Sequence, residues 1–256
     1  MRIALAALLL AALTPAQARE CSAQSGPHTT ALVELYTSEG CNSCPPADRW
    51  LQGLGARGYA PERVVPLSLH VNYWDYIGWK DPYAQQRFAD RQRRLAQVMR
   101  ARIVYTPQVL LQGQDFRGWH TASFDDAVAK INAQPPRASI ALRLQGGRGD
   151  TLDTQVSAAL LDPAQQPDAV LYLASYENKL VSSVSAGENR GRTLQHDYVV
   201  FEWVGPMPLT GGRVEARRAL PLLPKAVRAH SGVAAFVQNR RTAQVLQALM
   251  LPACPA

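Results

Sequence analysis

Hydrophobic and polar positions follow one pattern up to about residue 134 and a different pattern beyond it. In the first part, short apolar runs alternate with stretches whose apolar side chains recur at helical spacing. The pattern predicts strands at 32–36, 64–70, 108–112 and 115–118, and helices at 45–57, 82–100 and 124–133. The resulting order, β-α-β-α-β-β-α, is typical of a parallel-strand core covered by helices.

The second part begins where Gln134-Pro135-Pro136 ends the helical pattern. Apolar residues then alternate with period two, as at Ile140, Leu142 and Leu144. Further strands are predicted near 152–160, 169–176, 198–204, 213–220, 233–238 and 243–250, with a hairpin turn at 146–150. Short strands without intervening helices favour a mainly β, sandwich-like domain. We therefore expect an α/β domain at 19–136 and a β-rich domain at 137–256.

The N-terminal segment has the form of a cleaved signal peptide. Arg2 precedes an apolar run, and Ala16-Gln17-Ala18 supplies the small-x-small pattern at which signal peptidase cuts. No later run has the roughly 20 apolar residues of a membrane helix. We expect residues 1–18 to be removed after Ala18 and the protein to reach the periplasm or the medium without a membrane anchor.

Composition supports a globular protein without nucleic-acid partners. A hydrophobic content of 47% is enough for a substantial core, and the formal net charge is +7. The densest group of arginines, at 87–102, shares its stretch with apolar residues at helical spacing. This arrangement indicates a solvated helix face, and no nucleic-acid-binding motif is present.

A CxxC motif, Cys41-Asn42-Ser43-Cys44, joins the first predicted strand to the first predicted helix. A strand that leads into a CxxC at a helix start is the sequence form of a thioredoxin-like redox site. Helix N-terminal N–H groups stabilise a thiolate there, which favours Cys41 as the nucleophile. Pro45 and Pro46 indicate that the helix begins at or just after Cys44, so Cys41 gains less from the helix dipole.

The other two cysteines lie near the two ends of the chain. If Cys41 pairs with Cys44, Cys21 and Cys254 are left to form a structural disulfide, which an oxidising compartment favours. By loop entropy, such a bond contributes roughly 5 kcal/mol. The alternative is a free thiol on a frayed terminus.

Thr106-Pro107 strengthens the similarity to the thioredoxin fold, in which a cis-proline opens the third strand beside the CxxC. The resemblance implies that the Thr106 backbone pairs with an extended substrate segment and that Pro107 keeps metals from bridging the thiols. An ordinary trans proline at a strand start is the alternative.

The loop that starts at His70 lies at the same sheet edge as the CxxC, because a right-handed crossover places the two strand ends together. His70 and Asp75 are therefore candidates for stabilising the Cys41 thiolate or for moving a proton. The alternative is that His70 and Trp74 only pack this loop onto the domain.

A polar run in the second part includes Glu188, Asn189, Arg190 and Arg192. Two arginines with carboxylate and amide neighbours are suited to clamping an anionic ligand or a partner. A surface loop held by its own ion pairs, or a strap between domains, is the alternative. We find no nucleophile-base triad, P-loop or zinc-site spacing, and we predict no metal and no cofactor.

Three stretches are similar to one secreted family, catalogued as domain of unknown function 1223. They are Glu34–Asp48, His70–Asp75 with Gly78–Pro82, and Gly187–Leu194. The resemblance covers nearly all of the mature chain. It implies a thioredoxin-like fold without an established activity.

The leading hypothesis is an exported thiol-disulfide oxidoreductase. Cys41 exchanges with a substrate protein or a small thiol, Cys44 resolves the mixed disulfide, and an unknown redox partner restores the couple. One alternative is a copper(I)-handling module that uses both thiols and His70 as a further ligand. Another is a non-catalytic binding protein in which Cys41-Cys44 is a permanent staple.

Overall fold

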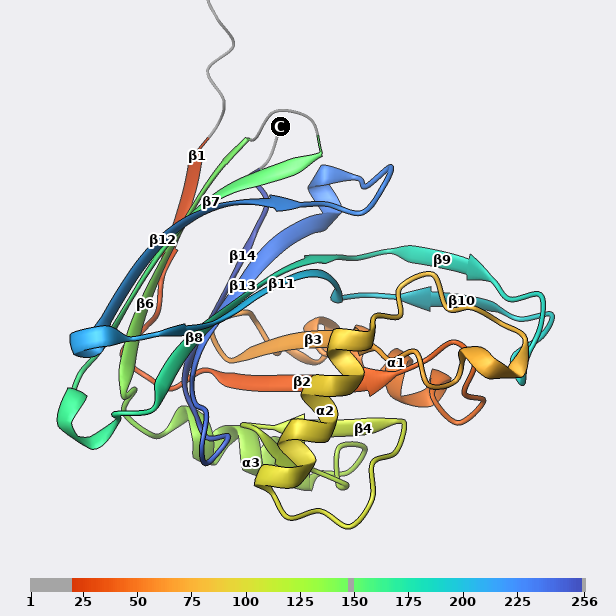
Figure 1. Ribbon diagram of the computed structural model, residues 1–256, viewed down its shortest axis with the longest axis horizontal. Coiled ribbons are helices and arrows are strands. Elements are labelled where there is room, and N and C mark those ends of the chain that lie inside the picture. Colours follow the sequence, from red (N-terminus) through yellow and green to blue (C-terminus); the bar gives the residue numbers. More distant parts are fainter. Residues whose placement is uncertain (1–19, 147–149, 255–256) are drawn as a thin grey trace, which may run out of the picture.

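Strands from both halves of the chain pair side by side in one eight-stranded sheet of the computed structural model (Figure 1). The structure describes residues 20–146 and 150–254, so the expected signal peptide and most of the expected turn at 146–150 lie outside it. The strand order is β14-β13-β8-β11-β3-β2-β4-β5. In that order the strands span Val245–Pro252, Ser231–Asn239, Ala169–Glu177, Val199–Pro208, Val64–His70, Ala31–Thr37, Gln108–Leu111 and Gln114–Asp115.

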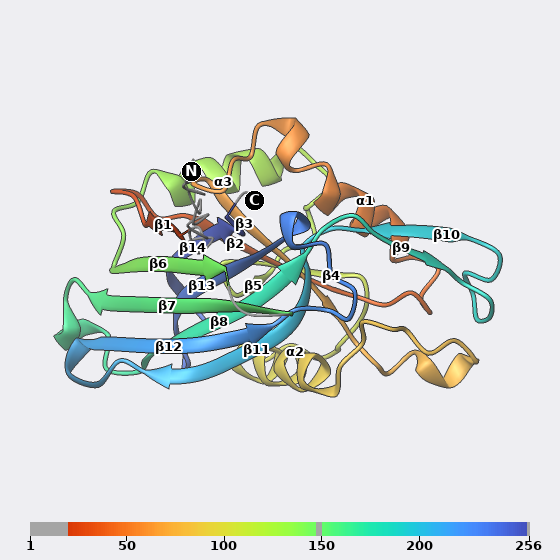
Figure 2. The ribbon, with the colours of Figure 1, turned by 90° about the horizontal axis from the view of Figure 1, so that it is seen from above.

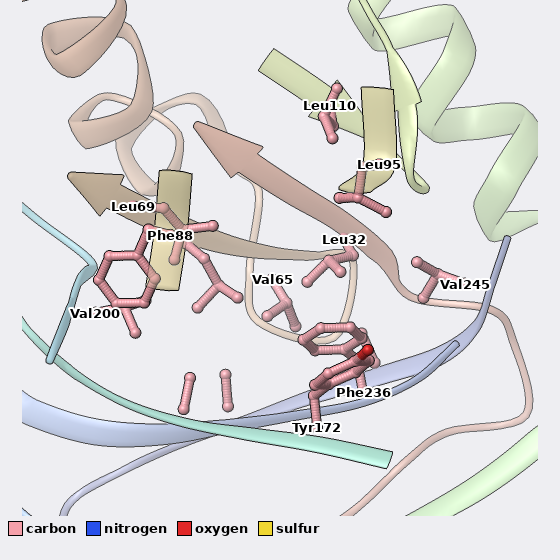
Figure 3. Packing of buried hydrophobic residues seen from close by; sticks show 14 of the residues in the cluster. Leu32, Val65, Leu69, Phe88, Leu95, Leu110, Tyr172, Val200, Phe236 and Val245 are labelled. Carbon is pink, nitrogen blue, oxygen red and sulfur yellow. The ribbon is translucent and has the colours of Figure 1, made fainter. Parts of the chain in front are cut away.

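Helices cover both faces of the β2–β3 region, which explains why these two strands are nearly continuous apolar runs. β2 lies parallel to β3 and antiparallel to β4. Helix α2 (Gln86–Val98) packs on one face, with Phe88 and Leu95 in the same cluster as Leu32 (Figure 3). Helices α1 (Pro45–Gln52) and α3 (Ser123–Asn132) lie on the opposite face (Figure 2).

A second sheet of four strands packs against the C-terminal part of the large sheet. Its order is β1-β6-β7-β12, and its strands span Glu20–Gln24, Ala138–Gly146, Thr151–Leu160 and Arg213–Pro221. Every second side chain of β7 is buried, and these residues share a core with β8, β13 and β14. Cys21 and Cys254 form a disulfide, so their predicted pairing is confirmed.

A two-stranded hairpin, β9 (Leu180–Ser183) and β10 (Thr193–His196), completes the sheets. The sequence predicts no strand here, because the segment is too polar for a strand signal. β10 nevertheless alternates with period two, since Leu194 and His196 are buried while their neighbours are exposed. The hairpin lies beside α1, where the Gln52 side chain donates a hydrogen bond to the Gln195 carbonyl oxygen.

The expected fold, an α/β thioredoxin-like domain followed by a β sandwich, is wrong. The described residues form a mostly β structure with three α-helices and a large mixed sheet. β3 is not the edge strand of a separate α/β sheet, because β11 pairs with it in parallel. Ser68 N donates a hydrogen bond to Tyr198 O at 2.8 Å. The eight-stranded sheet therefore runs across the boundary expected near residue 136.

None of the helices in residues 20–146 and 150–254 combines the length and apolar character required to cross a membrane.

An ion pair buried between α2 and the sheet links the two parts of the chain. The Arg91 guanidinium donates to both carboxylate oxygens of Glu34 on β2, at 2.9 and 2.6 Å. It also donates to Gln238 Oε1 on β13 at 3.1 Å. Both charged side chains are almost fully buried, so their bidentate geometry offsets a large loss of hydration.

Three aromatic rings from the C-terminal strands surround the same guanidinium. Its carbon lies 4.8 Å from the ring centroid of Tyr172, 4.7 Å from Trp203 and 5.3 Å from Phe236. Tyr172 and Phe236 stack on each other at 5.0 Å below the apolar cluster (Figure 3). Cation–π attraction is strongest where the cation is dehydrated, as it is here.

Replacing Arg91 with leucine should lower the free energy of unfolding by about 3–5 kcal/mol, because it leaves the Glu34 carboxylate buried without its partner. Denaturant titration followed by tryptophan fluorescence measures this loss. Arg93→Leu on the same helix is the control, since the Arg93–Asp90 pair is exposed and worth at most about 1 kcal/mol. Equal losses in the two variants would contradict the structural role of the buried pair.

Candidate functional site

The CxxC disulfide sits at the turn between β2 and α1. Cys41 N donates to Ser38 O, Cys44 N donates to Cys41 O, and the two cysteines are bonded with their Cα atoms 5.5 Å apart. The helix begins at Pro45 with Cys44 at the N-cap, where the two prolines predict its start. The prolines remove two N–H donors from the first turn, so Cys41 lies outside the helix with few backbone donors near its sulfur.

Two other groups lie close to the Cys41 sulfur instead. Ser43 Oγ is 3.2 Å and the Thr106 carbonyl oxygen 3.9 Å from Cys41 Sγ. The Thr106–Pro107 peptide bond is cis, and Trp74 Nε1 donates to Thr106 Oγ1 at 2.7 Å. The structure thus brings the predicted residues Thr106 and Pro107 beside the disulfide. Trp74 holds the threonine there.

The disulfide is covered by the loop between β9 and β10, residues 184–192, which we call the strap loop. Asn189 Nδ2 donates to the carbonyl oxygens of Glu39, at 2.8 Å, and Cys41, at 3.0 Å. Glu188 Oε2 accepts a hydrogen bond from Asn42 N at 3.0 Å. Both cysteines are 0% exposed, although Asn42 and Ser43 between them are exposed.

The predicted ligand loop therefore divides into two kinds of residue. Glu188 and Asn189 hold the CxxC turn, whereas the side chains of Arg190 and Arg192 are exposed. The contacts of Asn189 favour a strap between structural parts over a clamp for an anionic ligand.

His70 pairs with a carboxylate that the sequence did not single out. His70 Nδ1 lies 2.7 Å from Asp81 Oδ2, and both side chains are buried. Asp75, the other candidate for tuning the Cys41 thiolate, accepts a hydrogen bond from Asp81 N at 3.3 Å. Asp81 lies eleven residues beyond His70 in an irregular loop, and no period or motif of that loop marks it as a partner.

A second buried pair lies next to the first. His196 Nε2 is 3.0 Å from Glu39 Oε1, and Glu39 Oε2 accepts a hydrogen bond from Trp79 Nε1 at 2.8 Å. The rings of His70 and His196 are edge to face with centroids 4.9 Å apart. The sequence does not predict that Glu39 and His196 pair, because each stands among polar residues that indicate exposure.

These groups, together with Asp48 on α1, form what we call the buried polar cluster. Its members are Glu39, Asp48, His70, Asp81 and His196. Glu39 precedes Cys41 by two residues, and Asp48 follows Cys44 by one helical turn. In the described part of the chain, no group of three or more His, Cys, Asp or Glu side chains is arranged to hold a metal ion.

Burial and charge pairing set the protonation of the cluster. Burial lowers the pKa of His70, but the Asp81 carboxylate outweighs it, with help from Asp48 and Glu39, and raises that pKa to about 9. Burial raises the pKa of Asp81, but His70 and backbone donors outweigh this effect and lower it. At neutral pH the pair is therefore charged: His70 is protonated and Asp81 is a carboxylate.

The fold and site define a mainly β protein that carries a CxxC disulfide above a buried acid-base cluster. The chain belongs to the family described as protein of unknown function (DUF1223), whose model matches residues 32–238. The family description assigns no activity. No curated protein matches the chain.

Two solved structures share the fold. Protein AGR_C_4864 from Agrobacterium tumefaciens is 24% identical with a TM-score of 0.63, over 90% of this chain and 96% of that one. HBP35 of Porphyromonas gingivalis is 16% identical with a TM-score of 0.67, over 90% of this chain and 76% of that one. At these identities both likenesses concern the fold alone.

The His70–Asp81 pair should make stability depend on pH on the alkaline side. Because the pKa of His70 rises from 6.5 to about 9 on folding, the stabilisation is complete below pH 6.5 and is lost as pH rises through about 9. The loss should amount to about 3 kcal/mol, measured by urea unfolding at about pH 6 and about pH 10.

His70→Gln should abolish this dependence, whereas His120→Gln, at an exposed position, should keep it. A variant lacking His70 that still loses stability over the same range would show that another group carries the effect.

Proposed function

We propose that the protein exchanges electrons through the Cys41–Cys44 couple with a thiol or disulfide of an exported protein or a small molecule. The observation that carries the proposal is the environment of the Cys41 sulfur. Ser43 Oγ at 3.2 Å is placed to donate a hydrogen bond to a thiolate at Cys41, which compensates for the N–H donors that Pro45 and Pro46 lack.

The exchange has two steps. A substrate thiolate attacks Cys41 Sγ, the Cys41–Cys44 bond breaks, and Cys44 leaves as a thiolate that takes up a proton. In the second step another substrate thiol attacks the mixed disulfide, which releases an oxidised substrate and the reduced protein. Cys41 is the attacked residue because it lies outside helix α1 and next to the exposed Asn42, whereas Cys44 is the N-cap of that helix.

The location we propose is the periplasm or the medium, reached after cleavage near Ala18. Two disulfides, Cys21–Cys254 and Cys41–Cys44, are typical of proteins in oxidising compartments. The same setting supplies both oxidised and reduced thiol partners, so the direction of electron flow follows from the potential of the couple.

A second candidate is a permanent structural staple, which the complete burial of both sulfurs favours. The two functions differ in reduction potential. A couple below roughly −300 mV that fails to exchange with glutathione is structural, whereas a higher value marks an exchanging couple. Equilibration with glutathione buffers, read by alkylation of Cys41 and Cys44, separates them.

A Cys44→Ser variant should accumulate mixed disulfides through Cys41 in the exporting cell, because the resolving thiol is missing. Acid quenching, alkylation and non-reducing gels reveal such adducts, and reducing agents should dissolve them. The Cys41→Ser variant is the matched control and should trap nothing. An exported Cys44→Ser protein with a free Cys41 thiol and no adduct would count against exchange.

Asn189→Ala should make the disulfide more accessible, since it removes both hydrogen bonds that hold the strap loop on the CxxC turn. Each bond contributes about 1 kcal/mol, so reduction by dithiothreitol should accelerate about tenfold or more. Arg190→Ala in the same loop should leave the rate unchanged, because that side chain is exposed. Equal rates for all three proteins would mean that the strap loop does not limit access.

A further inference from the structure

Several buried polar atoms without a hydrogen-bond partner gather next to the disulfide. They are Thr37 Oγ1, Asp48 Oδ1, His70 Nε2 and His196 Nδ1. These four atoms come from a single cluster. Leaving one buried polar group unpaired costs about 1–3 kcal/mol, so four in one place indicate a site with a purpose other than stability.

The four residues are mutual neighbours, although they come from four elements. Thr37 and His70 are opposite each other in the β2–β3 pairing, and the His70 and His196 rings are 4.9 Å apart. Burial raises the pKa of Asp48, and His196, His70 and Thr37 act in the opposite direction on the same carboxyl group. Asp48 is therefore the member that the other three face.

Asp48 is also the member closest to the disulfide along the chain. Its N–H donates to Cys44 O at 3.1 Å, which closes the first turn of α1. Side chains four residues apart on a helix share a face, with Cβ atoms about 5–6 Å apart. Cys44 is 0% and Asp48 7% exposed, so both side chains of this i, i+4 pair are buried on the inner face of the helix start.

We propose that Asp48 exchanges a proton with Cys44 Sγ when the disulfide opens and closes, and that Thr37, His70 and His196 position its carboxyl group for this transfer. The inference rests on the proposed function. In the oxidised protein the Cys44 sulfur has no proton to give or take, which leaves the Asp48 oxygen without a partner; opening the disulfide creates that partner.

The proton balance follows directly. When a substrate thiolate attacks Cys41, the electron pair of the broken S–S bond goes to Cys44 Sγ, and the Asp48 carboxyl group, in its protonated form, gives that sulfur a proton. The products are a Cys44 thiol and an Asp48 carboxylate. In the reverse direction the carboxylate removes the proton from Cys44, so that its thiolate can attack Cys41 in the mixed disulfide.

A cavity of about 250 Å³ between α1 and β10 gives Asp48 a route to solvent. Its lining includes Asp48 and Arg49 on one side and Gln195 and His196 on the other. A proton lost to Cys44 is replaced through this cavity. His70 and His196 lower the pKa of this carboxyl group and Asp81 raises it, so charged groups of several elements act on Asp48.

The first test compares Asp48→Asn with Asp126→Asn, whose aspartate is exposed on α3. The rate of reduction by dithiothreitol is measured from about pH 5 to about pH 9 and divided by the thiolate concentration. In the wild type this corrected rate should fall as pH rises and the carboxyl group ionises. In Asp48→Asn it should be lower by roughly 100-fold at the acid end and independent of pH.

Asp126→Asn should reproduce the wild-type profile. An Asp48→Asn protein with the wild-type profile would overturn the proposal, because a purely structural role moves stability but leaves the pH profile unchanged. His196→Gln gives a positioning readout: the midpoint of the profile should shift while the rate at the acid end is retained. An unshifted midpoint removes His196 from the proposal.

The second test uses the unmodified protein and does not depend on any substrate. The Asp48 carboxyl carbon is followed by carbon-13 NMR against pH in the oxidised protein and in the protein reduced with excess dithiothreitol. Its titration midpoint should differ between the two states by one pH unit or more. Identical midpoints overturn the contact between Asp48 and Cys44. Failure of mixed-disulfide trapping together with differing midpoints overturns only the exchange function.

Discussion

The buried contact between Arg91 and Glu34 is the constraint on which the arrangement of the chain depends. A dehydrated guanidinium needs both carboxylate oxygens and the ring faces of Tyr172, Trp203 and Phe236 at once. Those groups come from β2 and from strands of the C-terminal half, so the charge is satisfied only when the strands lie in one sheet. That sheet in turn fixes the edge of β3, the position of β11 and the β9–β10 hairpin that follows β8.

The candidate site depends on the same continuous sheet. The strap loop and His196 reach the CxxC turn only because the C-terminal strands continue the sheet past β3. The buried polar cluster then combines groups of the N-terminal part with His196 of the C-terminal part. The disulfide is fully buried, so under the proposed function the same contacts would govern both the access of thiols and the supply of protons.

The local elements were predictable and their assembly was not. Apolar runs and the Pro45-Pro46 pair place β2, β3 and the start of α1, because these depend on neighbouring residues. The choice of partner for β3 depends on β11, more than a hundred residues away, and no local pattern encodes it. The same holds for the site. Cys41 and Cys44 form a motif, whereas Asp48, Glu39 and His196 acquire their role from folding alone.

The disulfide between Cys21 and Cys254, which are 233 residues apart in sequence, closes most of the chain into a covalent ring. A single proteolytic cut within that ring would leave two polypeptide fragments that the Cys21–Cys254 bond still joins covalently. One cut in an exposed loop therefore does not separate the protein into two unconnected pieces. After one such cut, the covalent continuity of the molecule rests on this sulfur–sulfur bond.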